Sequence, residues 1–363
     1  MKNIIAMIIL ALLVGCTSPY APIQSTYRDD YQNRGFTPLY QADSQTTIIM
    51  IHGMCNHSTG WAKSRVERLA DTMNLTVSHT SNRAIAREFD TKDGKNSIFL
   101  KSYHYARDGY QLTAYEFTYG AFNDHRAYHF QDDDKHALAN REIKKLLMDD
   151  CLSDVTVYAG ERGKDIRKAL RHSLKEIESK LSADERVFFL AESLGSKVLR
   201  DSLICQPENS SAANKSEQSK LNRLYYSADA IILASNQLPI LNHIDSCKDS
   251  PLARRSGKQE LSGGLLDMYR VNEELRAKQA DEGKSNSSSG YKVLSFTDPN
   301  DLLSYRFKES DFSTKNVQLL EIPVSNTSAF LNLLANPYKA HTGYLTNSGV
   351  VKLIACGNDD CAP

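Results

Sequence analysis

"FFLAESLGSKVLRDSL", residues 188–203, places a single serine between an apolar run and a helical pattern. Four apolar residues precede Glu192 and Ser193, and Gly195 follows two places after the serine. The apolar run has the length and composition of a buried strand, whereas the residues from 194 onward follow the period of a helix. Ser193 is therefore either a buried packing residue or a nucleophile on a tight strand-to-helix turn.

Apolar runs of strand length recur along the chain, and helical patterns separate several of them. We predict strands at 46–53, 111–120, 186–193, 229–235, 291–297 and 317–324, and helices at 61–73, 165–181 and 194–203. Strands as apolar as these are typically buried on both faces, as in parallel sheets. The alternation predicts an α/β fold with a mostly parallel central sheet flanked by helices.

The turn around Ser193 is the strongest candidate for a site. Residues 191–195 read Ala-Glu-Ser-Leu-Gly, which matches the nucleophile elbow G-x-S-x-G except that alanine replaces the first glycine. Ligands of open parallel sheets bind beyond the carboxyl ends of the strands, which is where this serine is predicted to lie. An acyl-transfer site also needs two N–H groups aimed at the developing oxyanion, and Met54 and Leu194 are the candidate donors.

These features resemble the α/β-hydrolase superfamily in its lipase and esterase style, and the resemblance covers roughly residues 45–355. It implies a triad in the chain order Ser, acid, His. The resemblance implies Asp301 as the acid, within "YKVLSFTDPNDLLSY" (291–305), with Asp298 as the alternative closer to the strand end. It also implies His341 as the base, in a late loop that follows the last predicted strand.

Other readings of single residues remain open. His52, Cys55 and His57 have a spacing that could bind a metal, but the oxyanion loop explains this segment better, with His52 positioning it. Trp61 is expected in the core rather than in the wall of an acyl pocket. Glu192 and the run 132–134 are expected to be solvated. We therefore predict neither a metal nor a cofactor.

The beginning of the chain is typical of a bacterial lipoprotein signal. Lys2 supplies positive charge, and 11 apolar residues follow from Ile4 to Val14, which is shorter than a membrane-spanning helix. The run ends in Leu-Val-Gly-Cys, which resembles a lipobox with lipidation at Cys16. Thr17 follows, and retention in the inner membrane usually goes with Asp at this place. We therefore expect export and a lipid anchor, in the outer membrane if the cell is Gram-negative.

The lipoprotein signal and the resemblance to hydrolases together predict the domain organisation. We predict a signal peptide over 1–15, a lipidated tether over 16–44 that lies outside the core, and a hydrolase domain over 45–363. Two long stretches, 121–160 and 236–290, could carry a cap or lid.

The charge balance and the cysteine content bear on possible partners and on disulfide bonds. Lys plus Arg and Asp plus Glu both number 44, so no overall charge attracts nucleic acid, and we expect no nucleic-acid partner. Beyond Cys16 the chain has six cysteines, an even number that suggests disulfides in an exported protein. Cys356 and Cys361 are the pair that a short polar turn would join, and a zinc site is the rival reading.

Together these patterns predict a membrane-anchored serine hydrolase that cleaves carboxylic esters through an acyl-enzyme, with an ester or lipid as substrate. The alternative is a non-catalytic surface lipoprotein that keeps a hydrolase-like fold and binds a partner. The sequence does not specify the acyl chain, and ester, thioester and amide substrates all remain open.

Overall fold

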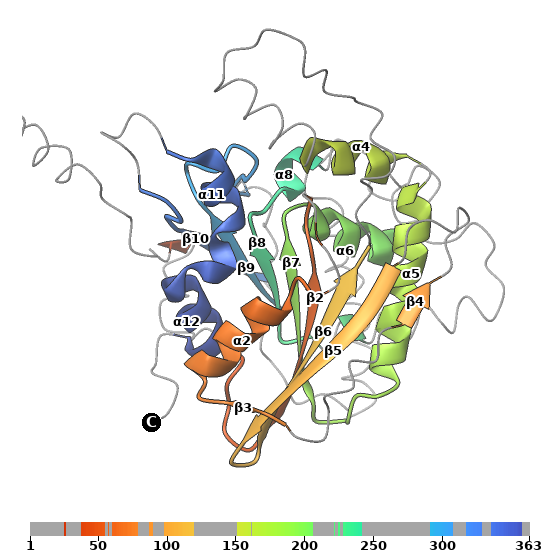
Figure 1. Cartoon of the computed structure of the whole chain (residues 1–363), viewed down its shortest axis with the longest axis vertical. Helices are drawn as coiled ribbons and strands as arrows, with labels where there is room; N and C mark the ends of the chain where they lie inside the picture. The colour runs from red at the N-terminus through yellow and green to blue at the C-terminus, as the bar shows by residue number, and fades with distance from the viewer. Residues whose placement is uncertain are drawn as a thin grey trace, which may run out of the picture.

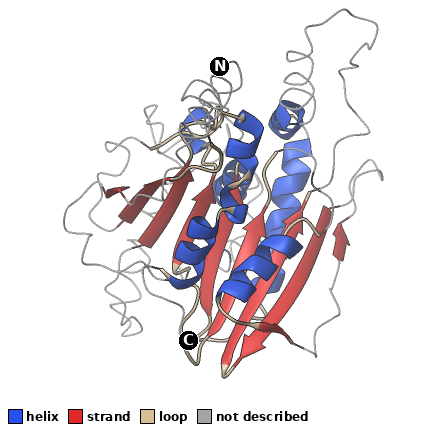
Figure 2. Ribbon diagram, turned by 60° about the vertical axis from the view of Figure 1, so that its left-hand side comes forward, coloured by secondary structure: helices blue, strands red, loops and turns tan. Residues whose placement is uncertain are grey.

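A computed structural model shows how these segments are arranged (Figure 1). It describes residues 25–26, 38–54, 57, 60–78, 87–89, 98–119, 151–160, 162–205, 221, 224–225, 228–241, 291–307, 317–328 and 335–357. A central sheet carries helices on both faces, as a view turned by 60° also shows (Figure 2). The predicted α/β class is therefore confirmed.

The sheet has ten strands in the order β1-β10-β9-β8-β7-β2-β6-β5-β3, with β4 paired to β5. Six neighbouring strands, from β10 to β6 in this order, are parallel. The pairs β1–β10, β3–β5, β4–β5 and β5–β6 are antiparallel. The strands are β1 (Ser25–Thr26), β2 (Gln45–Ile51), β3 (Thr76–Val77), β4 (Arg87–Phe89), β5 (Ile98–Arg107), β6 (Tyr110–Thr118), β7 (Arg186–Glu192), β8 (Ala230–Ala234), β9 (Tyr291–Thr297) and β10 (Val317–Pro323).

The apolar runs form the parallel strands because helices cover both of their faces. On β7, Phe188 and Leu190 belong to one core cluster, whereas Phe189 and Ala191 belong to the cluster on the opposite face. Side chains alternate between the two faces of a strand, so a strand buried on both sides needs an unbroken apolar run. All six predicted strands are present, and their bounds differ from the predicted ones by at most two residues.

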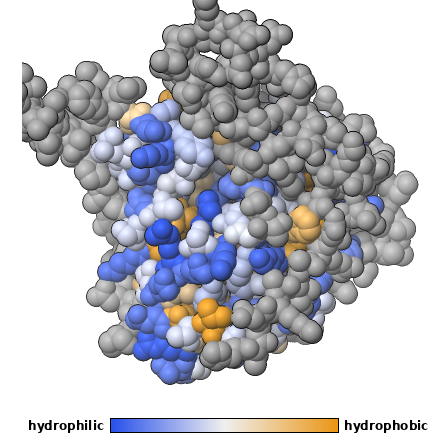
Figure 3. All heavy atoms as spheres, in the orientation of Figure 1, coloured by the Kyte–Doolittle hydropathy of each residue, from blue (hydrophilic) through white to orange (hydrophobic). Residues whose placement is uncertain are grey.

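The helices lie in two groups. The helices α4 (Ser153–Ala159), α5 (Arg162–Glu178), α6 (Leu194–Ile204) and α8 (Leu238–Leu241) contribute to one core cluster, and α2 (Lys63–Thr72) and α12 (Ser348–Cys356) contribute to the other. On α5, the stripe of Ile166, Leu170, Leu174 and Ile177 is buried, as its helical spacing predicts. Hydrophilic side chains predominate over α2 and α12 on the face seen in Figure 3.

The hairpin of β5 and β6 is the largest element that the sequence reading missed, because it predicted only the second strand. The turn residues Asp108 and Gly109 have φ of 46° and 86°, and Arg107 pairs with Tyr110 across them. A two-residue turn with both φ values positive is the I′ type, for which Asp-Gly is a favoured sequence. The Asp-Gly pair was therefore an available signal for this hairpin.

Two segments within the predicted tether over 16–44 contact the folded core. β1 pairs with β10, and Leu39 is fully buried. The Leu39 N–H donates to the Ile354 carbonyl, at 3.1 Å. The Leu39 carbonyl accepts hydrogen bonds from the side chains of Thr46, Tyr110 and Arg186. One buried apolar side chain and the hydrogen bonds of its backbone therefore tie a segment that is polar on average to the core.

Several predictions fall on parts of the chain outside the described residues. They are the signal peptide at 1–15, Cys16, the acidic run 132–134, and most of the two stretches considered for a cap or lid. Of those two stretches, the structure describes 151–160, which includes α4, and 236–241, which includes α8. No helix within the described ranges is long and apolar enough to cross a membrane.

One buried carboxyl makes stability depend on pH. Glu321 on β10 is 1 % exposed. Burial raises its pKa to about 7, against the opposing effects of the Phe307 N–H, Ser295 and Arg306. In the unfolded chain the pKa is 4.5, so between these two values the folded state binds the extra proton. Stability therefore falls as the pH rises through this window, by up to about 3 kcal/mol at about 1.4 kcal/mol per pKa unit.

We expect Glu321→Gln to remove this pH dependence, since glutamine keeps an oxygen for the Phe307 N–H and does not ionise. Urea unfolding of both proteins at about pH 5 and about pH 8 measures the effect. The variant should gain stability relative to the native chain at the higher pH. An equal difference at both pH values would contradict the raised pKa.

Candidate active site

Ser193 lies on a sharp turn between β7 and α6. Its φ of 52° and ψ of −122° are strained for a residue with a side chain. The Ser193 N–H donates to the carbonyl of Ala234 at the end of β8, at 2.8 Å. Its own carbonyl accepts from the Ser196 hydroxyl at 2.6 Å. The neighbouring strand and the first turn of α6 therefore hold the turn on both sides, and Ser193 is only 4 % exposed.

Two glycines allow this turn to pack against the end of β2. A Cβ added at Gly195 would lie 2.5 Å from the carbonyl oxygens of both Ile51 and His52. A Cβ added at Gly53 would lie 2.5 Å from Cβ of Ser193. Both contacts are too short for any larger residue. The glycine two places after Ser193 is thus required by the close approach of two backbones, as the elbow pattern predicts.

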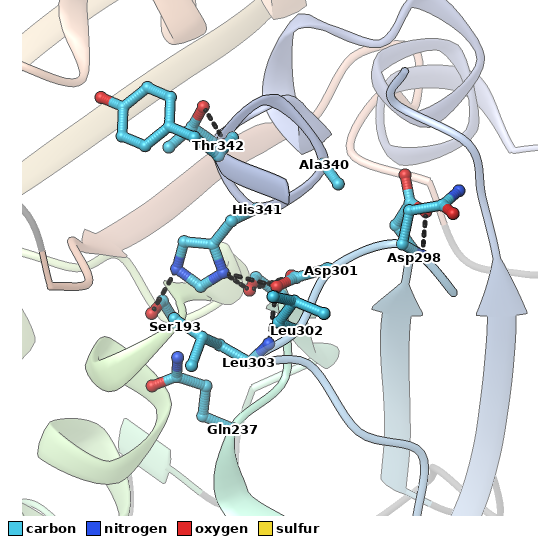
Figure 4. Close-up of polar contacts among 12 residues, drawn as sticks. Ser193, Gln237, Asp298, Asp301, Leu302, Leu303, Ala340, His341 and Thr342 are labelled. Atoms are coloured by element: carbon cyan, nitrogen blue, oxygen red, sulfur yellow. Dashed lines mark hydrogen bonds and ion pairs between the residues drawn. The ribbon is translucent and has the colours of Figure 1, made fainter. Parts of the chain in front are cut away.

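His341 points its ring at this serine. Nε2 of His341 lies 3.0 Å from Oγ of Ser193, as Figure 4 shows. The residue belongs to the short helix α11 (Pro337–Thr342) rather than to the loop that the sequence predicted. Asn336 caps this helix through the Lys339 N–H, and Pro337 occupies its first turn, which are favourable choices at a helix start.

Asp301 lies at the other ring nitrogen. Its Oδ1 is 2.9 Å from Nδ1 of His341 and also accepts the Leu303 N–H at 3.0 Å. Burial alone would raise the pKa of the Asp301 carboxyl. The hydrogen bonds and charge of His341, with help from Leu303, outweigh burial and lower this pKa below its usual value. An ionised carboxylate therefore faces the imidazole.

Asp298, the alternative acid, lies apart from His341 in Figure 4 and has a different role. Its Oδ1 accepts the Asn300 N–H at 2.8 Å, and its Oδ2 accepts the Asn326 N–H at 2.6 Å. It thus ties the loop after β9 to the loop after β10. Burial raises the pKa of Asp298. Of the two candidates, the structure brings Asp301 to the histidine.

The sequence reading missed two hydroxyls at the same carboxylate. Ser235, directly after β8, has Oγ 2.7 Å from Oδ2 of Asp301 and 2.8 Å from Nδ1 of His341. The Tyr344 hydroxyl donates to Oδ2 of Asp301 at 3.0 Å and accepts the Asp298 N–H. The signal for Ser235 was its place at the carboxyl end of a predicted parallel strand.

The two candidate oxyanion donors lie beside Ser193. Leu194 is the first residue of α6, and Met54 follows Gly53, whose backbone approaches the serine. The side chains of Leu194 and Met54 are both buried. Both residues are thus direct chain neighbours of Gly53 and Ser193, the two residues that meet at the tight contact.

His52 and Tyr119 hold this end of β2 in place. Nδ1–H of His52 donates to the Gly53 carbonyl at 2.7 Å, and Nε2 accepts the Tyr119 N–H at 3.1 Å. The Tyr119 hydroxyl donates to the carbonyls of His52 and Gly53. Burial, with a contribution from His57, lowers the pKa of His52 well below its usual value. The neutral His52 ring therefore holds the backbone of this loop in position, which is the structural role predicted for it.

Glu116 fixes the far end of the same loop. Its carboxylate accepts hydrogen bonds from the backbone N–H groups of Gly60 and Ala62 and from the hydroxyls of Tyr103 and Thr118. The loop that carries Met54 is therefore held at both of its ends.

Two further expectations concern residues around this loop. Trp61 is buried, as predicted. The centroid of its ring lies 5.6 Å from the ring centroids of both His52 and His57. Glu192, which was expected to be solvated, is instead 9 % exposed and pairs with Arg65 of α2 at 3.3 Å. Glu192 is buried because it is the last residue of β7 and faces the helix α2 on that side of the sheet.

The predictions of a metal site and of a disulfide involve three cysteines, of which the structure describes only Cys356. Among the described residues, no group of three or more His, Cys, Asp or Glu side chains is placed to hold a metal ion, and Cys55 lies outside them. Cys356 is buried in α12, whereas Cys361 lies beyond the described ranges, so their pairing stays a prediction.

Comparisons of the chain with models of protein families, with curated proteins and with solved structures gave no match.

Proposed function

We propose that this protein is a serine hydrolase of the α/β-hydrolase type that cleaves carboxylic esters through an acyl-enzyme. The observation that carries the proposal is one continuous set of contacts. Oγ of Ser193 lies 3.0 Å from Nε2 of His341, and Nδ1 of His341 lies 2.9 Å from Oδ1 of Asp301. A serine hydroxyl is a weak nucleophile until a base within hydrogen-bonding distance removes its proton.

In the acylation step, Oγ of Ser193 attacks the ester carbonyl carbon while its proton moves to Nε2 of His341. Asp301 keeps the other ring proton on Nδ1 and stabilises the imidazolium that forms. The negative charge develops on the carbonyl oxygen, and the N–H groups of Met54 and Leu194 are the proposed donors to it. The carbon–oxygen bond to the leaving group then breaks, and the alcohol leaves with the proton from His341.

In the deacylation step, water takes the place of the alcohol. His341 removes a proton from this water, which attacks the acyl carbon and releases the carboxylic acid. The proton returns to Oγ of Ser193, so the enzyme ends as it began.

The topology supports this proposal. Ser193 directly follows β7, Asp301 lies in the loop after β9, and His341 follows β10. The strands β7, β8, β9 and β10 are adjacent and parallel, so their carboxyl ends lie at one edge of the sheet. The chain order Ser, Asp, His is the order that α/β-hydrolases use. The chain departs from their elbow pattern at Ala191, where a small side chain still fits.

Hydrolysis of p-nitrophenyl esters of increasing acyl-chain length by the purified full chain tests the proposal. We expect release of p-nitrophenol together with covalent labelling by a fluorophosphonate, which reacts with activated serines. The chain-length optimum would separate an esterase from a lipase. A folded protein that neither hydrolyses an ester, thioester or amide nor takes up the label would favour the non-catalytic binding protein instead.

We also propose that lipid on Cys16 anchors the enzyme to the cell envelope, because the lipobox-like residues lie at the end of the apolar run. Two or more acyl chains hold a protein stably on a bilayer. Metabolic labelling with radioactive palmitate should mark the native chain and not Cys16→Ala. Recovery of both proteins in the membrane fraction, with neither labelled, would contradict the anchor.

A further inference from the structure

Ser235 occupies an unusual place next to the proposed triad. It directly follows β8, its φ is 55°, and it is 1 % exposed. The preceding residue, Ala234, accepts the backbone N–H of Ser193. Ser193 and Ser235 thus follow adjacent strands, both have positive φ, and one hydrogen bond links the two turns. Strained residues of this kind gather at functional sites, where the surrounding structure holds them in place.

The contacts of Ser235 define which way its hydrogen bonds run. Asp301 is ionised and can only accept, so the Ser235 hydroxyl must donate to Oδ2 of Asp301. Oγ then presents a lone pair toward Nδ1 of His341, 2.8 Å away. The proton on Nδ1 has two acceptors, Oδ1 of Asp301 and Oγ of Ser235. This arrangement keeps the proton on Nδ1 and leaves Nε2 free to accept the proton of Ser193.

We propose that Ser235 is a positioning residue of the proposed hydrolase, which locks both the His341 ring and the Asp301 carboxylate in the geometry that activates Ser193. The inference rests on the proposed function. Its second support is the strain, because a left-handed conformation is unfavourable for a residue with a side chain. Glycine would avoid this cost, but it has no hydroxyl for Asp301 and His341.

Two matched controls separate this role from an ordinary buried hydroxyl. Ser202 on α6 is also buried, and its hydroxyl donates to the Val198 carbonyl at 2.6 Å. Ser202→Ala is therefore the same chemical change away from the triad. Tyr344→Phe removes a donor to the same Oδ2 of Asp301, together with the acceptor of the Asp298 N–H. Ser235→Ala removes the contacts to both triad members.

The experiment measures kcat and KM of the purified full chain on a p-nitrophenyl ester. For Ser235→Ala we expect kcat to fall about 10- to 100-fold with KM within about twofold, because small displacements of reacting groups cost this much. Tyr344→Phe should lose less, and Ser202→Ala should lose nothing. If kcat of Ser235→Ala equals that of Ser202→Ala, the inference is wrong.

A spectroscopic readout keeps the inference separate from the proposed function. The downfield proton resonance of His341 Nδ1–H, assigned by its disappearance in His341→Gln, should shift in Ser235→Ala and stay in place in Ser202→Ala. An inactive native chain would overturn the proposed hydrolase, whereas the shift would still establish that Ser235 holds the ring. An unshifted resonance in Ser235→Ala would overturn the positioning role.

Discussion

Replacing Ser193 by alanine is expected to reduce kcat for ester hydrolysis by roughly 10⁴- to 10⁶-fold and to abolish fluorophosphonate labelling. The substitution removes one oxygen, the proposed nucleophile, and leaves the fold intact. Alanine has the same Cβ as serine, so the close contact with Gly53 and the positive φ of residue 193 are unchanged. His341→Ala should cost about as much, because it removes the base that lies 3.0 Å from the Ser193 hydroxyl.

The double variant provides the stricter test of a shared mechanism. Groups that act as one unit in a reaction lose their effect together, so Ser193→Ala with His341→Ala should be no slower than either single variant. Thermal unfolding of each protein should show that activity, and not folding, was lost. Ester hydrolysis by Ser193→Ala at the native rate would place the nucleophile elsewhere.

The second large effect is expected at Asp301 and not at Asp298. In Asp301→Asn the amide can turn a donor toward Nδ1 of His341, which favours the tautomer with its proton on the wrong nitrogen. We expect kcat to fall about 10⁴-fold, with the chain still folded. The structure supports this choice because Oδ1 of Asp301 lies 2.9 Å from that nitrogen.

Asp298→Asn is the matched control for this substitution, since both carboxylates are buried and lie three residues apart. Asp298 accepts backbone N–H groups of Asn300 and Asn326, and an asparagine can accept only one of them well. The expected loss is therefore stability, by about 1–3 kcal/mol, with kcat changed little. Measuring kcat and urea unfolding for both variants decides the matter. A larger loss of kcat in Asp298→Asn would assign the acid to that residue.

The strands and the turn at Ser193 were predictable because their signals are local. Unbroken apolar runs indicate strands buried on both faces, and the small residues at 191 and 195 indicate a tight crossing of strand and helix. The antiparallel strand β5 escaped prediction because its continuous apolar run is only three residues long, Ile98–Leu100, before Lys101 and Ser102 interrupt it. The Asp108-Gly109 turn was the local feature that could have revealed it.

The sequence by itself determined the α/β class, the segments that form the parallel strands and the place of Ser193 between a strand and a helix. These properties depend on residues that are neighbours in the chain. Only the tertiary structure decided that Asp301 rather than Asp298 meets His341, that Ser235 contacts both, and that Leu39 and Glu192 are buried. The physical reason is that these contacts join residues far apart in the chain, and their partners depend on strand order and on the path of each loop.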